Sequence, residues 1–370
     1  MADPHPTPPT SFDSAVAGVL PVDAGAASAA SDHLDRLTKP QGSLGRLEAT
    51  AIRLAAIARS SPPPVPEPAT VAVFAGDHGV LDQGVSPWPV EVTAQMVANF
   101  CAGGAAVNVL AAHVGADVVV VDVGVATDIA NVPEGTGFLD RKVRRGTADL
   151  TRQPAMTVDE ARRALDVGVI VATDAVASGA RCLLTGDMGI GNTTPSAALI
   201  ALFTGRPPRE VTGRGTGIDD ERWEVKVGVI EEALARHAAD PGGAGDPSDP
   251  LTALSSLGGL EIAALVGYLV GGAALRVPVV LDGVIAAAAA VVAAAFAPEV
   301  TGYLIAGHRS AEPGAGVALD HLGLEPLLDL DLRLGEGSGA CLALPVIQAS
   351  AKVVREMATF ESAGVTDEQG

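Results

Sequence analysis

Asp187 is the residue best placed for chemistry in the glycine-rich segment 181–195. It carries a carboxylate and directly follows a short apolar run. Gly189 and Gly191 then leave the backbone bare, and Asn192 and Thr193 stand where a helix is predicted to begin. A buried strand, a glycine loop and a capped helix direct free backbone N–H groups at an anion. The segment matches neither a P-loop nor the dinucleotide fingerprint. A carboxylate beside an anion cradle therefore indicates a sugar-phosphate ligand whose reacting carbon lies near an ionisable group.

A second carboxylate, Glu336, stands between Gly335 and Gly337 in the sequence GEGSG. The glycines leave the carboxylate uncrowded and let the backbone approach a ligand closely. In an apolar pocket its pKa rises, and it can then act as a general base. The structural alternative is a glycine-rich helix start, with Glu336 favoured by the helix dipole. Together with Asp187, this residue forms a carboxylate pair typical of chemistry at an anomeric carbon, and the glycine loops add a phosphate to that picture.

Other polar side chains have both a functional and a structural interpretation. Lys226 lies on a helix predicted after the glycine-rich segment 213–217, where it could contact a phosphate or face solvent. His78 and His308 could bind a metal, but neither belongs to a metal-binding motif, so we predict no metal and no other cofactor. A strand-end hydrogen bond is the structural interpretation of His78. Trp88 could wall a flat aromatic ligand or fill a gap in the core.

Apolar runs that alternate with helical patterns must position these residues. The predicted strands are 71–75, 117–121, 181–185, 277–281 and 301–306, and the predicted helices between them are 91–112, 158–178, 195–203, 221–236, 259–273 and 284–297. Strands without polar alternation, separated by helices, predict an α/β fold, namely a mostly parallel, Rossmann-like sheet with helices on both faces. Each strand ends in glycine and a polar residue, and ligands bind outside those carboxyl ends.

Composition excludes several classes of partner. The formal net charge is −20 and aromatic residues are only 3% of the chain, which disfavours nucleic acid and anionic membranes. The N-terminus lacks the basic and apolar regions of a signal peptide. The apolar segment 284–296 is too short to span a bilayer and predicts a buried helix. Three cysteines without metal-ligand spacing indicate buried thiols in a reducing cytoplasm, so we predict a cytoplasmic protein.

The chain divides into four predicted parts. Residues 1–12 are rich in proline and predicted to be disordered, and residues 363–370 are predicted to form a frayed tail. Residues 13–62 and 340–362 are predicted to form a small helical domain, and residues 63–339 a large α/β catalytic domain. The segment 241–250 is predicted to be a mobile surface loop.

Several long strings, in order, resemble the nicotinate-nucleotide–dimethylbenzimidazole phosphoribosyltransferase family. They are LTKPQGSLGRLE (37–48), AGDHGV (75–80), GVSPWPVEVT (84–93), DMGIGNTT (187–194), GRGTG (213–217), LDGV (281–284), GHRSAEPG (307–314) and LGEGSGA (334–340). The resemblance implies a parallel α/β domain with a small helical domain from both chain ends, assembled as a homodimer. It implies transfer of the phosphoribosyl group of nicotinate mononucleotide to 5,6-dimethylbenzimidazole, which gives α-ribazole 5′-phosphate, the lower-ligand nucleotide of cobalamin, and nicotinate.

The same resemblance assigns roles to individual residues. Glu336 matches the family's general base, and attack opposite the leaving group inverts the anomeric carbon. Asp187 and Lys226 match catalytic positions, although Asp187 stands where the family pattern has glutamate and is one methylene shorter. The residues that match or lie near substrate-binding positions are Ser86, Gln95, Gly189, Gly191, Asn192, Thr193, Asp282, Ser310 and Gly337.

Two other functions stay open from the sequence. A nucleotide hydrolase would use water in place of the benzimidazole and release nicotinate without an acceptor. A riboside-binding protein without activity would bind both substrates and form no product, and the shortened Asp187 is the feature that favours it.

Overall fold

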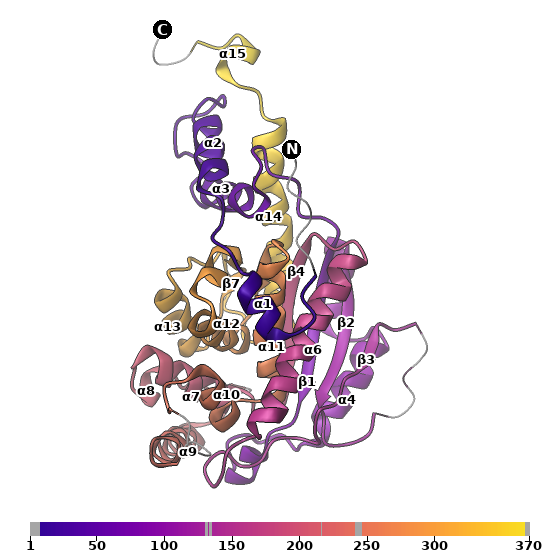
Figure 1. The fold of residues 1–370 in the computed structure, drawn as a ribbon, viewed down its shortest axis with the longest axis vertical. Coiled ribbons are helices and arrows are strands. Elements are labelled where there is room, and N and C mark those ends of the chain that lie inside the picture. Colours follow the sequence, from indigo (N-terminus) through magenta and orange to yellow (C-terminus); the bar gives the residue numbers. More distant parts are fainter. Residues whose placement is uncertain (1–7, 130–131, 133–134, 216, 241–245, 367–370) are drawn as a thin grey trace.

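The computed structural model describes residues 8–129, 132, 135–215, 217–240 and 246–366. Within these residues, six parallel strands form one sheet in the order β3-β2-β1-β4-β5-β6. Figure 1 labels β1, β2, β3 and β4 of this sheet. The strands are β1 (Ala69–Gly76), β2 (Ala116–Gly124), β3 (Phe138–Asp140), β4 (Cys182–Met188), β5 (Val279–Leu281) and β6 (Leu304–Ala306), with a separate parallel pair of β7 (His308–Arg309) and β8 (Leu328–Asp329). The predicted α/β fold class and the five predicted strands are confirmed. β3 was missed because its three residues are not buried and form no apolar run.

The strand order places the site. The chain builds β1, β2 and β3 outward on one side, then returns to build β4, β5 and β6 on the other. The carboxyl ends of β1 and β4 are therefore neighbours at the point where the order reverses, which is where open parallel sheets bind ligands. The polar residues at the carboxyl ends of these two strands, 77–78 just after β1 and 187 within the last residues of β4, consequently meet at one edge of the sheet.

Helices make up most of the remaining described chain. They are α1 (Phe12–Gly18), α2 (Ala24–Leu34), α3 (Arg46–Ala58), α4 (Glu91–Cys101), α5 (Ala106–Val114), α6 (Val158–Ala177), α7 (Thr193–Thr204), α8 (Pro208–Val211), α9 (Asp220–Ala239), α10 (Pro250–Leu257), α11 (Leu260–Ala274), α12 (Val284–Phe296), α13 (Pro313–Leu322), α14 (Ser338–Glu356) and α15 (Phe360–Ala363), with 3-10 turns η1 (Gly79–Gln83) and η2 (Pro298–Tyr303).

The two faces of the sheet carry different helices. Phe74 of β1 faces the larger core with residues of α6, α11 and α12, whereas Val71 and Val73 of the same strand face a second core with residues of α4, α5 and α14. This alternation follows from the period of two in a strand, and burial on both faces explains the continuous apolar runs. α12 is buried as predicted.

Two loops differ from the sequence-based prediction. The predicted helix 91–112 is broken between α4 and α5, where Gly103 has φ of 78° and a Cβ on Gly104 would lie 2.3 Å from the Asn99 side chain. The predicted loop 241–250 is described only from residue 246, and Asp249 caps α10, which begins at Pro250. Residues 241–245 lie outside the described residues.

The length and composition of Glu91–Val114 would allow it to cross a membrane. That segment consists of the two separate helices α4 and α5, and 33% of its most apolar window is buried. A cytoplasmic location stays a prediction.

The chain ends pack in two places. Leu37 and Ala51, beside α2 and in α3, form a small core with Val354 near the end of α14, at the top of the molecule in Figure 1. α1 packs instead on α6 and α11, and its first residue, Phe12, is buried against Phe296. Phe12 thus begins a packed helix. Residues 1–7 and 367–370 lie outside the described residues, so the predicted disorder of 1–12 and the predicted frayed tail stay predictions. The assignment of residues 13–62 and 340–362 to a small helical domain stays a prediction.

Candidate functional site

A cavity of about 700 Å³ opens at the carboxyl ends of β1, β4 and β5. Its walls combine apolar side chains with a few charged ones, which is typical of a small-molecule site. The sequence-predicted residues that line it are Ser86, Asp187, Gly189, Gly191, Asn192, Thr193, Lys226, Ser310 and Glu336. Three others do not line it: Gln95 is exposed on α4, Gly337 lies behind Glu336, and Asp282 faces α14.

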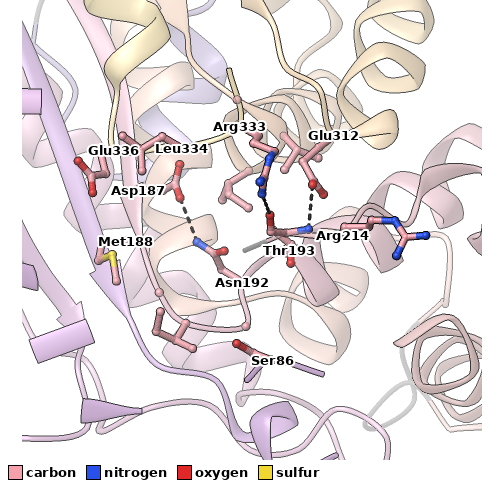
Figure 2. A pocket seen from close by; sticks show the side chains of 18 of the residues that line it. Ser86, Asp187, Met188, Asn192, Thr193, Arg214, Glu312, Arg333, Leu334 and Glu336 are labelled. Atoms are coloured by element: carbon pink, nitrogen blue, oxygen red, sulfur yellow. Dashed lines mark hydrogen bonds between the residues drawn. The ribbon is translucent and has the colours of Figure 1, made fainter. Parts of the chain in front are cut away.

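Asp187 forms one end of the cavity together with Glu336 (Figure 2). Its Oδ2 accepts a 3.0 Å hydrogen bond from Asn192 Nδ2, and its Oδ1 has no hydrogen-bond partner among the residues that the structure describes. Burial, reinforced by the Asp282 carboxylate, raises the pKa of Asp187 well above its usual range. The side chain of Asn192 thus holds Asp187 and does not cap α7, which begins at Thr193.

Glu336 reaches the cavity from a strained turn. Its φ is 64°, between Gly335 at 84° and Gly337 at 95°, so three consecutive residues adopt left-handed backbone. The turn packs tightly on β4, because a Cβ on Gly186 would lie 2.6 Å from the Glu336 carbonyl oxygen. Glu336 is 6% exposed, and burial raises its pKa. Within the described part of the chain, its Oε2 has no hydrogen-bond partner. A buried carboxylate with a raised pKa and a free oxygen is suited to accept a proton.

Asp282 holds this turn from behind. Its Oδ2 accepts from the N–H of Gly337 at 3.1 Å, and its Oδ1 accepts from Gly339 at 2.7 Å and Ala340 at 3.0 Å. These are the free N–H groups at the start of α14, where a carboxylate is favoured by the helix dipole. His308 Nε2 lies 3.7 Å from Asp282 Oδ1. The Asp282 carboxylate is therefore engaged by the backbone of α14.

Lys226 forms the opposite end of the cavity. It is 1% exposed, and its Nζ donates to Thr193 Oγ1 at 2.7 Å and to the Gly213 carbonyl at 3.2 Å. Burial lowers the pKa of Lys226 to about 8, although the Glu312 carboxylate acts in the other direction. The structural alternative, a solvated helix face, is wrong for this lysine.

The loop that contains Gly215, for which sequence analysis predicted no contacts, completes this end of the cavity. Glu312 Oε1 accepts from the N–H of Gly215 at 2.8 Å, and Arg333 donates to the Gly215 carbonyl at 2.7 Å (Figure 2). Arg214 lines the same wall. Sequence reasoning missed Arg214, Glu312 and Arg333, although GRGTG and GHRSAEPG contain two of them, because their meeting depends on the fold. Within the described residues, no cluster of three or more His, Cys, Asp or Glu could hold a metal.

Comparisons with known proteins identify the family of this chain. The phosphoribosyltransferase family DBI_PRT matches residues 19–365. The chain belongs to this family. The nicotinate-nucleotide–dimethylbenzimidazole phosphoribosyltransferase of Salinispora tropica is 57% identical over 360 residues, which covers 94% of this chain and 97% of that protein. The protein of the same name from Geobacter sulfurreducens is 51% identical over 358 residues and covers 97% and 99%. The crystal structure of the enzyme of that name from Thermus thermophilus has a TM-score of 0.86 and 45% identity, covering 93% of this chain and 99% of that chain. The chain is thus a phosphoribosyltransferase.

Proposed function

We propose that this phosphoribosyltransferase transfers the phosphoribosyl group of nicotinate mononucleotide to 5,6-dimethylbenzimidazole in cobalamin synthesis, with inversion at the anomeric carbon. The observation that carries the proposal is the polarity of one cavity. The buried carboxylates of Asp187 and Glu336 lie at one end. The charged side chains at the other end are those of Lys226, Arg214 and Arg333, beside the Glu312 carboxylate. A ribose 5′-phosphate laid along it puts its phosphate at the cationic end and its anomeric carbon near the acids.

Glu336 is the general base in this proposal. Its free Oε2 takes the ring N–H proton of dimethylbenzimidazole, so the other ring nitrogen attacks the anomeric carbon. The new N–C bond forms as the bond to the pyridinium nitrogen breaks, and its electron pair leaves with nicotinate. The pyridinium is already positively charged, so its departure needs no acid. Attack on the face opposite nicotinate converts a β-riboside into an α-riboside.

The remaining residues bind and position in this proposal. Lys226, Thr193 and the N–H groups at the start of α7 hold the phosphate, because charge and helix dipole both favour an anion there. Gly189, Gly191 and Asn192 hold the ribose, with Asp187 oriented by Asn192, and Ser310 lines the opposite wall. Ser86 lies on the wall formed with Val85, Trp88, Val92 and Met96, which supports an apolar aromatic base there. Gln95, Gly337 and Asp282 act from outside the cavity.

A product assay tests the proposal. Purified protein is incubated with nicotinate mononucleotide, with and without dimethylbenzimidazole, and products are identified by mass and anomeric proton coupling. An α-riboside phosphate formed only with the acceptor is expected. Nicotinate released without a new riboside would support a hydrolase, and binding of both substrates without product would support a binding protein.

A homodimer is part of the same proposal. The family resemblance and the high apolar content, with 48% hydrophobic residues, support it. Light scattering at micromolar concentration is expected to give twice the 37.0 kDa chain mass. A single species of one chain mass would contradict it.

A further inference from the structure

A buried ion pair that the proposed mechanism does not use lies behind the glycine loop of the site. His78 follows β1, and its Nε2 lies 2.7 Å from Oε1 of Glu261, which stands in the first turn of α11. Both side chains have 0% exposure. No described residue bonds His78 Nδ1 or Glu261 Oε2, so the hydrogen bond between the two side chains is the one that orients them. His78 belongs to the AGDHG segment at the end of β1. Glu261 belongs to the start of α11, which sequence analysis did not connect with the site.

The pair is in van der Waals reach of the loop that follows β4. A Cβ on Gly189 would lie 2.3 Å from the Gly76 carbonyl oxygen and 3.3 Å from His78 Nε2. A Cβ on Gly259 would lie 2.4 Å from His78 Cε1, and one on Gly76 would lie 2.8 Å from Glu261 Oε2. Because Gly76, Gly189 and Gly259 have no side chains, they leave the space that the pair fills, and the edge of the imidazole packs against Gly189.

The pair also acts electrostatically on the site. Burial disfavours the imidazolium, but the Glu261 carboxylate outweighs it and raises the pKa of His78. The Glu261 charge is one of those that raise the pKa of Asp187. A buried ion pair seldom stabilises a fold more than an apolar pair of equal volume, and such pairs are retained in several systems because they specify one arrangement. Here the arrangement next to the pair is the glycine loop.

We propose that His78 and Glu261 form a positioning pair that fixes the 189–191 loop, and through it Asn192 and Asp187, in the geometry that receives the phosphoribosyl half of the nucleotide. This inference rests on the proposed function, because the nucleotide is the ligand that the loop would receive. The inference predicts that the pair affects the binding of one substrate and not of the other. In the proposed arrangement the nucleotide contacts the loop, and the base lies on the wall formed by Ser86 and Trp88.

The test compares two amides at position 78. The side chain of His78→Gln reaches as far as Nε2 and keeps the hydrogen bond to Glu261, whereas the shorter side chain of His78→Asn does not. The dissociation constant for nicotinate mononucleotide, measured by calorimetry, and both KM values are determined for each variant. H78N is expected to weaken nucleotide binding about tenfold, with the KM for dimethylbenzimidazole within about threefold. H78Q is expected to stay within about threefold of the unchanged protein for both. His113→Asn, at an exposed histidine near the end of α5, is the matched control.

A purely structural role would lower the melting temperature of H78N and leave the ratio of the two KM values unchanged, which would overturn the proposal. Equal nucleotide dissociation constants for H78N and H78Q would do the same. If H78N does not fold, Glu261→Asp, which withdraws the carboxylate by one methylene, replaces it with the same expected loss. Nucleotide binding is read without turnover, so a protein that binds the nucleotide but forms no riboside would refute the proposed function and still test the pair.

Discussion

The two ends of the cavity are built on opposite principles. At the cationic end, Lys226 donates two hydrogen bonds, and Arg333 and Glu312 each bond the backbone of Gly215. At the acidic end, Asp187 and Glu336 each keep one buried oxygen that no described residue bonds. Buried polar groups are nearly always paired, so the unpaired oxygens of these two cavity-lining acids are suited to exchange a proton with a ligand. The paired end is suited to hold a group that does not react.

The largest effect is expected where the acidic end loses its base. Glu336→Gln keeps the size of the side chain but cannot accept the proton at neutral pH. Turnover is expected to fall at least ~10²-fold, because a positioned base contributes that much or more. The dissociation constant of the nucleotide should change little. Steady-state assays with Glu356→Gln, at the exposed C-terminal end of α14, the helix that follows Glu336, provide the control. Near-normal turnover of E336Q would contradict the proposal that the acidic end supplies the base for the chemical step.

A change at the cationic end should act on binding. Lys226→Met removes a charged donor near the phosphate, so the KM for the nucleotide is expected to rise about 10- to 100-fold. The KM for the base should change much less. Lys352→Met, at an exposed lysine of α14, is the control. A loss confined to kcat would instead assign the lysine to the chemical step.

The same lysine gives the site a pH dependence. Because burial lowers its pKa to about 8, the ammonium loses its proton as the pH rises through that value, well below the ordinary lysine range. The kcat/KM for the nucleotide is therefore expected to fall above about pH 8. Lys226→Arg should flatten this limb, because arginine stays charged.

Asp282 connects the acidic end to the fold. Asp282→Asn weakens the acceptor that three N–H groups of the 337–340 segment share. We expect kcat to fall about tenfold and the melting temperature to decrease, since hydrogen bonds to a charged group are worth about 1.5–3 kcal/mol. The KM for the nucleotide should stay nearly constant. Asp329→Asn at the exposed end of β8 should change neither quantity. A tenfold higher nucleotide KM would return Asp282 to the substrate-binding residues.

The smallest effect is expected at Asp187. Burial raises the pKa of Asp187 and so favours its neutral form, which the amide of Asp187→Asn resembles, and the amide oxygen can still accept from Asn192. Turnover of D187N is expected to stay within about fivefold of the unchanged protein, far from the loss in E336Q. Parallel kcat measurements on the two variants decide this. Losses of equal size would mean that the acids act as one coupled pair.

How far the sequence anticipated these features depended on the range of the interactions. Continuous apolar runs predicted the strands of the central sheet, and the strand-end glycines predicted Asp187, Asn192 and Thr193 in one cavity, because both signals are local. Lys226 needed the resemblance as well. Asp282 was assigned to substrate although its carboxylate binds a helix start 55 to 58 residues further along the chain. Neither Glu312 nor the partner of His78 could be found, since these contacts join segments that no local pattern relates.

The left-handed backbone of Glu336 has an evolutionary consequence. A residue with a side chain costs of order 1–3 kcal/mol in such a region, and burying its carboxylate adds to that cost. Glycine or asparagine would relieve both. A population selected for thermal tolerance alone should therefore lose the acid at this position, and one selected for catalysis should keep it. At the turn that presents Glu336, selection for stability and selection for turnover therefore favour different residues at a single position.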